Sequence, residues 1–214
     1  MAENTAYITA HTAITHHSVY RNGGLLFADE QAAGPSEMLV SAYKHFNIVY
    51  PKFYKMDNLC KLGFLAAEML VQGGKVTEHY KHEEVGLVLS NTNASLDADI
   101  NYFNTIKNIP RPAQFVYTLP NIVIGEISIR HHYKGENAFF VSEKFDAQFM
   151  WFYVSDLLRR TALKACICGW VECLGDNYKA VLWLVEKKGD NKSLAFTIEH
   201  IHQIYELTNG EING

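Results

Sequence analysis

Apolar and polar positions along the chain follow two alternating patterns, one typical of strands and the other typical of helices. Residues 56–74 carry the clearest helical pattern. The apolar positions on its one face are Leu59, Leu62, Leu65, Ala66 and Met69. Asp57 stands at the N-cap position, and Gly73 and Gly74 follow the last periodic residue. This segment is therefore expected to be a long amphipathic helix.

Shorter apolar and β-branched runs predict the strands. The expected strands are 6–14, a hairpin at 18–29 around Asn22, Gly23 and Gly24, then 83–91, 138–143, 164–172 and 178–188. The other expected helices are 36–46 with Ser36 as N-cap, 94–108 ended by Pro110 and Pro112, a helix opened by Pro120 and Asn121, 147–162, and 193–207. Strands that alternate with helices of this length predict an α/β domain with a largely parallel central sheet.

Composition limits the classes of protein that remain. The 214 residues are 48% hydrophobic and 20% charged, which fits one compact domain over residues 1–214. The net charge of -4 shows no basic excess, so no nucleic-acid partner is expected. No apolar run reaches the roughly 18 residues of a membrane helix, and the first residues lack the layout of a signal peptide. A cytoplasmic location is the expectation.

Cysteine and histidine spacing does not favour a metal site. Cys166 and Cys168 would share one face of a strand, and with Cys60 and Cys173 they are expected to be buried structural thiols. Adjacent histidines such as His16 and His17 point in different directions on a helix or a strand, so they rarely bind one ion together. We therefore expect neither a metal nor another cofactor.

Several motifs in the second half of the chain resemble one enzyme family. Asn121 and Gly125 match a PN-x-x-x-G helix, and KGEN at 134–137 resembles a KGPN turn. Gly169, Trp170 and Glu172 stand near the place of a Gly-Gly/Ala-x-Glu pattern. Their order resembles the N-terminal half of the β-ketoacyl-acyl-carrier-protein synthases, best over residues 85–187. The resemblance implies an α/β thiolase-like half-fold, with a mostly parallel mixed five-stranded sheet and helices on both faces.

The nucleophile of that family is absent from this sequence. Counting forward from Gly135 places the family's catalytic Cys at Lys144, which Ser142 and Glu143 precede and Phe145 follows. The family's second half, which supplies two catalytic histidines and a Lys, has no counterpart here. The resemblance therefore implies a catalytically impaired accessory subunit, similar to a chain-length factor, in fatty-acid, polyketide or aryl-polyene-type synthesis.

Two interpretations of Lys144 remain open. A lysine removed from water could act as a nucleophile or base, whereas a solvated lysine would pair with Glu143 or Asp146. The resemblance also places an acyl-channel-like set at Leu119, Asn121, Ile122, Gly125 and Phe140; the alternative is that these residues are core and helix cap.

The resemblance further implies a dimer, either a homodimer or a heterodimer with another synthase-like chain. The dimer strand would consist of Ala138, Phe139, Phe140, Val141, Ser142 and Glu143. An acyl carrier protein is a further expected partner: Lys52 and Lys55 in the segment 50–57 could bind its phosphate, unless this segment only packs its aromatic rings. Two other functions stay open, an acyltransferase or condensing enzyme completed by a second chain that supplies the missing histidines, and a stand-alone acyl-ligand binding module.

Overall fold

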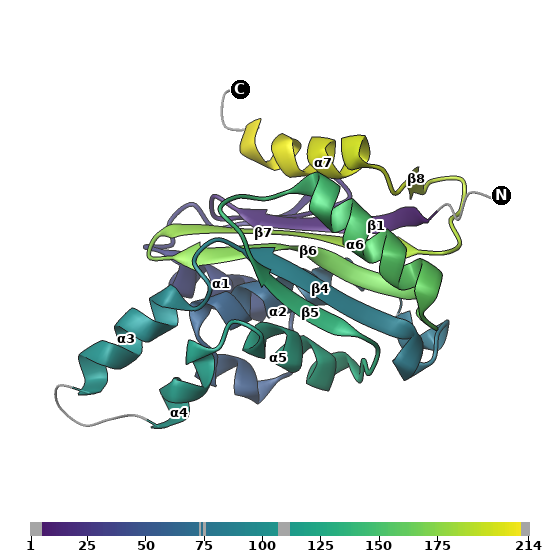
Figure 1. Cartoon of the computed structure of the whole chain (residues 1–214). Helices are drawn as coiled ribbons and strands as arrows, with labels where there is room; N and C mark the ends of the chain where they lie inside the picture. The colour runs from purple at the N-terminus through teal and green to yellow at the C-terminus, as the bar shows by residue number, and fades with distance from the viewer. Residues whose placement is uncertain (1–5, 73, 75, 107–111, 211–214) are drawn as a thin grey trace.

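A mixed sheet of eight strands forms the centre of the protein in the computed structural model, which describes residues 6–72, 74, 76–106 and 112–210 (Figure 1). The strand order is β3-β2-β1-β7-β6-β4-β5, and β8 pairs with β1 outside this path. The strands are β1 (Tyr7–Thr15), β2 (Ser18–Arg21), β3 (Gly24–Ala28), β4 (Val85–Asn91), β5 (Asn137–Val141), β6 (Ala165–Leu174), β7 (Asn177–Glu186) and β8 (Leu194–Ala195).

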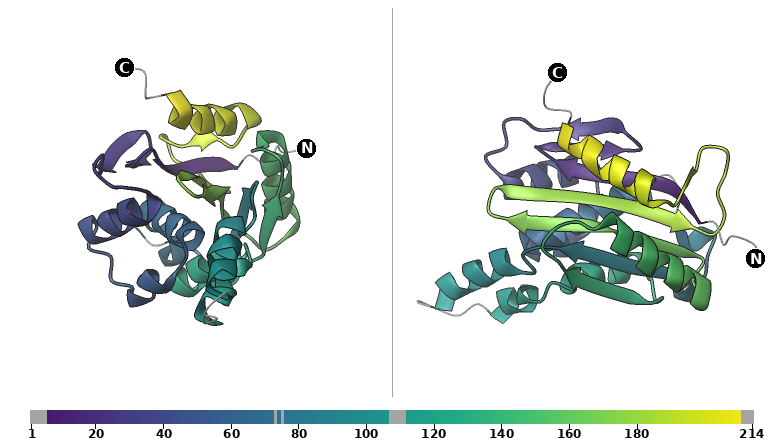
Figure 2. Two further views of the ribbon diagram at one scale, coloured as in Figure 1. Left: turned by 90° about the vertical axis from the view of Figure 1, so that its left-hand side faces the viewer. Right: turned by 45° about the horizontal axis from the view of Figure 1, so that its top comes forward.

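Helices cover both faces of this sheet. The helices are α1 (Pro35–His45), α2 (Asn58–Leu70), α3 (Leu96–Ile106), α4 (Pro112–Phe115), α5 (Ile122–His131), α6 (Ala147–Arg160) and α7 (Ile198–Gly210). Two short 3-10 helices, η1 (Pro51–Lys55) and η4 (Val116–Thr118), precede α2 and α5. Figures 1 and 2 show α1, α2 and α5 on one face and α6 and α7 on the other, while α3 and α4 extend beyond the sheet as an arm.

The α/β class with helices on both faces is confirmed, but the number and direction of the strands differ from the expectation of a mostly parallel five-stranded sheet. Only β4 pairs in parallel, with β5 on one side and β6 on the other; the other five pairings are antiparallel. One reason is the connection between β6 and β7, where only Gly175 and Asp176 lie between the paired residues Leu174 and Asn177. A two-residue turn can join only antiparallel neighbours.

Two hydrophobic cores form because side chains alternate across the strands. On the α2 face, Leu87 and Ile167 pack with Phe64 and Leu62, all of them buried. On the α6 face, Trp183 is fully buried with a second set of apolar side chains. That second set includes Val88, Cys166, Cys168, Met150, Val154, Phe196 and Ile201. Side chains of the chain's own helices therefore cover the sheet on both sides.

Local signals in the sequence located most elements and missed some ends. Asp57 caps α2 as predicted, since its Oδ1 accepts a hydrogen bond from the Cys60 N–H at 3.0 Å. Ser36 is not a cap, because Pro35 already occupies the first turn of α1, a position that suits proline. The predicted stops at Gly73 and Pro110 lie outside the described residues.

Two helical glycines differ in the space around them, which gives a paired prediction. A Cβ on Gly63 of α2 would lie 2.3 Å from Cγ2 of Val123, whereas a Cβ on Gly125 of α5 would meet nothing within 4 Å. We expect Gly63→Ala to lower the free energy of unfolding by about 1–2 kcal/mol through overpacking. Gly125→Ala should raise it by up to about 1 kcal/mol through helix propensity.

Urea unfolding of both variants would check this pair. Equal effects of the two substitutions would contradict the close approach of α2 and α5 at Gly63.

Candidate functional site

The turn that resembles a nucleophile elbow lies at the carboxyl end of β5, next to the end of β4. Hydrogen bonds fix it there: the Ser142 N–H donates to the Asn91 carbonyl at 2.9 Å, and the Thr92 hydroxyl donates to the Glu143 carbonyl at 3.2 Å. Asp146 then caps α6 through the N–H of Phe149. The carboxyl ends of neighbouring parallel strands are where ligands bind in many α/β proteins, so this turn is a candidate functional site.

A buried carboxylate from β6 holds the loop that follows β4. Glu172 is 7% exposed, and its Oε2 accepts hydrogen bonds from the N–H groups of Thr92 at 2.7 Å and Asn93 at 3.1 Å. The Asn91 side chain bonds both the N–H and the carbonyl of Ala94, which has a left-handed φ of 50°. Glu172 belongs to one of the motifs that carry the family resemblance, but that motif does not show that its carboxylate holds this loop.

Lys144 does not have the environment of an activated lysine. Its side chain is exposed, so burial cannot activate its amine as a nucleophile. The structure also shows no ion pair from Lys144 to Glu143 or Asp146 within 4.0 Å. The solvated interpretation fits better than the catalytic one, although without the expected partner.

Aromatic rings fill the space on the sheet side of this turn. The Phe145 ring stacks on Tyr205 of α7 at 4.1 Å between centroids and lies parallel to Trp183 at 5.5 Å. Trp170 meets the same ring edge-on at 6.0 Å. Burial raises the pKa of the Tyr205 phenol to about 12. The helix α7 therefore packs against Phe145, the residue that follows the turn. Nothing in the sequence indicates this contact, because it joins residues 60 positions apart.

The five acyl-channel-like residues do not line one channel within this chain. Ile122 packs against the core on the α2 face, whereas Phe140 packs against the core on the α6 face. Leu119 is 56% exposed, and Asn121 precedes α5 without capping it through its side chain. Gly125 has no neighbour within 4 Å of a Cβ position, so it brings no second element close within the described residues. An acyl-channel role for this set stays a prediction.

The outer edge of β5 has no strand beside it in the described residues. β5 pairs only with β4, and it ends at Val141, so Ser142 and Glu143 belong to the turn rather than to the predicted strand. Ala138, Phe139 and Phe140 are half-buried, and Val141 is 56% exposed.

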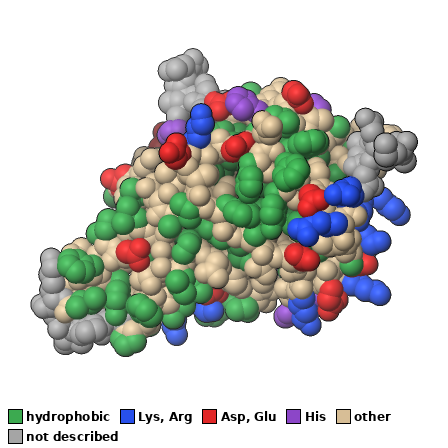
Figure 3. Space-filling model, in the orientation of Figure 1, with side chains coloured by type: hydrophobic (Ala, Val, Ile, Leu, Met, Phe, Trp, Pro, Cys, Tyr) green, Lys and Arg blue, Asp and Glu red, His purple; other side chains and the backbone are tan. Residues whose placement is uncertain are grey.

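Exposed apolar side chains also occur on the helical segments next to β5, and we call them with Val141 the β5 apolar surface. Its other members are Leu119 and Ile129 of the α5 side and Trp151 and Phe152 of α6. The helix α5 contacts β5, and rings of α6 contact Phe140 of β5. Further exposed apolar residues lie on the arm: Ile100, Phe103, Ile106, Phe115 and Val116. Figure 3 shows apolar side chains gathered across this side of the molecule and along the arm. A free strand edge with apolar surroundings is a ready template for association.

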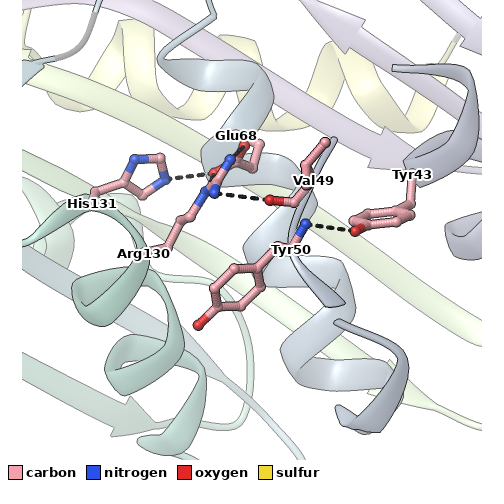
Figure 4. Close-up of polar contacts among 6 residues, drawn as sticks. All are labelled: Tyr43, Val49, Tyr50, Glu68, Arg130 and His131. Carbon is pink, nitrogen blue, oxygen red and sulfur yellow. Dashed lines mark hydrogen bonds and ion pairs between the residues drawn. The ribbon is translucent and has the colours of Figure 1, made fainter. Parts of the chain in front are cut away.

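A polar network at the far end of α5 fixes the loop before η1 (Figure 4). Arg130 donates to both carboxylate oxygens of Glu68 in α2, at 2.8 and 3.0 Å, and to the Val49 carbonyl at 3.3 Å. Nε2 of His131 lies 3.1 Å from Glu68 Oε1. Burial opposes ionisation of Glu68, but the hydrogen bonds from His131 and Arg130 outweigh it and lower the pKa of this carboxyl to about 2.

The aromatic segment 50–57 packs its rings, as one of the two interpretations expected. Phe53 is fully buried, and Tyr50 stacks on Phe64. Lys52 is bound to the buried carboxylate of Glu126 at 2.7 Å, so this lysine is already paired. Lys55 lines a cavity beside α3.

The predicted burial of the thiols is confirmed, since all four cysteines are buried. Burial raises the pKa of Cys166 to about 12. Within the described ranges, no three His, Cys, Asp or Glu side chains are arranged to hold a metal ion. No helix in the described part of the chain is both long and apolar enough to cross a membrane.

Replacing the buried carboxylate at position 172 should loosen the loop after β4. Glu172→Gln removes the charge that two backbone N–H groups face, so we expect the free energy of unfolding to fall by about 1–3 kcal/mol. Amide exchange at Thr92 and Asn93 should become faster. Glu143→Gln, at an exposed position, is the matched control. Unchanged exchange in Glu172→Gln would contradict the role of Glu172 as a clamp, that is, as the carboxylate that holds the N–H groups of Thr92 and Asn93.

The low pKa of Glu68 predicts a loss of stability in acid. Because the folded-state pKa of about 2 lies below the ordinary 4.5, the ion pairs stabilise the fold fully above pH 4.5. This contribution, on the order of 3 kcal/mol, should be lost as pH falls through this window. Urea unfolding between pH 2.5 and 6 should show a steeper fall for the native chain than for Glu68→Gln. Parallel curves would reject this linkage.

Comparison with known proteins identifies the fold. No family model matches the sequence, and no curated protein matches it significantly. One chain of the ishigamide ketosynthase/chain length factor aligns with a TM-score of 0.66 and 18% identity, over 85% of this chain and 62% of that one. One chain of AntDE:AntF, a type II polyketide synthase ketosynthase with its acyl-carrier protein, aligns with a TM-score of 0.62 and 12% identity, over 85% and 62%.

A third similar structure has nearly the same extent as this chain. It belongs to the ketosynthase ApeO in complex with its chain length factor ApeC from Xenorhabdus doucetiae, and it aligns with a TM-score of 0.56 and 10% identity over 97% of this chain and 92% of that one. The protein described here spans 62% of the first neighbour's length and almost all of this one. The chain therefore has the thiolase-like fold shared by ketosynthases and chain length factors.

Proposed function

We propose that this chain is a non-catalytic partner subunit of a ketosynthase and acts in the manner of a chain length factor in polyketide or aryl-polyene-type synthesis. The observation that carries the proposal is the free edge of β5 within the β5 apolar surface. An isolated chain would leave this surface in water, whereas a partner strand would complete the sheet and cover the flanking side chains.

The turn after β5 supports a role without covalent catalysis. Condensation needs an activated thiolate to hold the acyl group and hydrogen-bond donors at the developing oxyanion. Here Lys144 is exposed where the resemblance expects Cys, and the Phe145 ring fills the space beneath. The four thiols of the chain are buried.

The partner is proposed to be a ketosynthase chain, with an acyl carrier protein as a further component. Known complexes of similar chains support this choice, because they pair a ketosynthase with a chain length factor or with a carrier protein. Stable association buries about 800 Å² on each partner.

The two other functions have less support. An acyltransferase completed by a second chain would still need a nucleophile at the turn, where Lys144 is exposed. A stand-alone acyl-binding module would need the channel-like residues on one side of the sheet, and Ile122 and Phe140 lie on opposite sides.

A charged residue at the free edge should separate the subunits. We expect Val141→Glu to weaken binding to a co-purified ketosynthase at least tenfold, because a carboxylate would be buried beside a strand edge. Val49→Glu is the matched control, since Val49 is 79% exposed and lies outside the β5 apolar surface. Light scattering would measure the mass of the complex and titration calorimetry its dissociation constant, for both variants and for the native chain with the same ketosynthase.

Full binding by Val141→Glu would contradict the assigned interface. A native chain that stays monomeric and binds no ketosynthase would contradict the function itself.

A further inference from the structure

We propose that the outer face of α3, on the arm, docks into an apolar groove of the same ketosynthase subunit that pairs with β5. This inference rests on the proposed function and deepens it, because it gives the partner a second contact that the free strand edge does not include. The residues of this face are Leu96, Ile100 and Phe103, and we call them the α3 stripe.

The amphipathic helix α3 turns its apolar side to the solvent. Leu96, Ile100 and Phe103 recur at i, i+4 and i+7, a spacing that places them on one face of a helix. Their exposed fractions are 41, 48 and 61%. The opposite face lines a cavity beside α2, through Asp97, Ala98, Asn101 and Thr105. A surface helix normally packs its apolar stripe on the core, so the reversed orientation of α3 indicates a face that another molecule covers.

Polar contacts at the inner face hold α3 in this orientation. Asp97 accepts hydrogen bonds from the Gly175 N–H at 3.0 Å and from the Asn101 side chain at 3.2 Å. The hydroxyl of Ser95, just before α3, donates to the Thr118 carbonyl at 2.7 Å. The α3 stripe is therefore presented in a fixed direction. Binding does not have to order the helix first, which lowers the cost of association.

Exposed apolar side chains lead from the α3 stripe to the β5 apolar surface. The Phe115 ring of α4 lies 5.5 Å from the Tyr102 ring of α3, measured between centroids. Phe115 and Val116 are exposed, and Leu119, three residues after Val116, already belongs to the β5 apolar surface. Figure 3 shows apolar side chains along the arm and across the body of the molecule on the same side. One partner can therefore contact both sets.

The size of a stable interface favours one partner that covers both sets. Such an interface uses about 20–30 residues on each side. β5 has five residues, and the β5 apolar surface adds four from neighbouring segments. An amphipathic helix that lays its apolar face into a groove is a common mode of recognition. Since β5 is proposed to pair with a ketosynthase, we assign the α3 stripe to a groove on that subunit; a second copy of this chain is the other occupant that the experiment distinguishes.

A lysine in the α3 stripe should weaken the complex. We expect Ile100→Lys to weaken binding to the co-purified ketosynthase at least tenfold, because its ammonium group would be buried in an apolar groove without a partner. Leu25→Lys is the matched control and should bind as the native chain does, since Leu25 is 59% exposed on β3, at the other edge of the sheet. Titration calorimetry measures the dissociation constants, and thermal unfolding checks that each variant is folded.

Hydrogen exchange of the native chain decides the question if Ile100→Lys does not fold. Backbone amides of α3 should exchange more slowly in the complex with the ketosynthase than in the free chain. Unchanged exchange in α3, or native affinity in a folded Ile100→Lys variant, would overturn the inference.

Failure of this inference is distinguishable from failure of the proposed function. If Val141→Glu weakens binding and Ile100→Lys does not, the ketosynthase role stands and the α3 contact is rejected. If the native chain binds no ketosynthase, both are rejected. A native homodimer that light scattering detects without ketosynthase, and that Ile100→Lys dissociates, would show that a second copy covers α3 and would also overturn the inference.

Discussion

The central physical constraint in this protein is that β5 has a hydrogen-bonded neighbour on one side only, so the backbone groups along its outer edge have no strand to pair with in the described residues. β4 satisfies the inner side of β5, and the described residues offer nothing to the outer side. The other edge of the sheet, β3, is also free, and it carries exposed Leu25 and Leu26. What distinguishes β5 is the wider apolar surface around it, contributed by α5 and α6. The β5 edge is therefore the one at which we propose association.

The face beside this edge is closed by the chain's own C-terminal helix. Tyr205 of α7 stacks on Phe145, and the Lys179 ammonium lies 3.8 Å from the centre of the Tyr205 ring. Burial lowers the pKa of Lys179 to about 8. Ile201 and Ile204 of α7 complete the core over Trp183. Phe145, which follows the turn after β5, is thus part of a packed aromatic cluster.

Local physics made much of the fold predictable from sequence. Helical periodicity located α2, the Asn22 turn located the hairpin, and Asp57 marked a cap. The direction of strand pairing was not predictable in the same way, because it depends on which strands meet across the sheet. β8 has two residues, too few for a periodic signal. The Glu172 clamp and the Phe145 stack join distant segments, so no window of sequence contains either of them.

The resemblance predicts a candidate site at the end of β5, but it could not say what surrounds that turn. Lys144 is exposed, whereas the strand that precedes it carries the free edge. Hydrogen exchange of the β5 segment Asn137–Val141, with and without a bound ketosynthase, tests this most directly. Binding of a ketosynthase at the β5 edge should slow exchange in β5 and leave exchange in β3 unchanged. Equal protection of both edges, or no protection of β5, would contradict it.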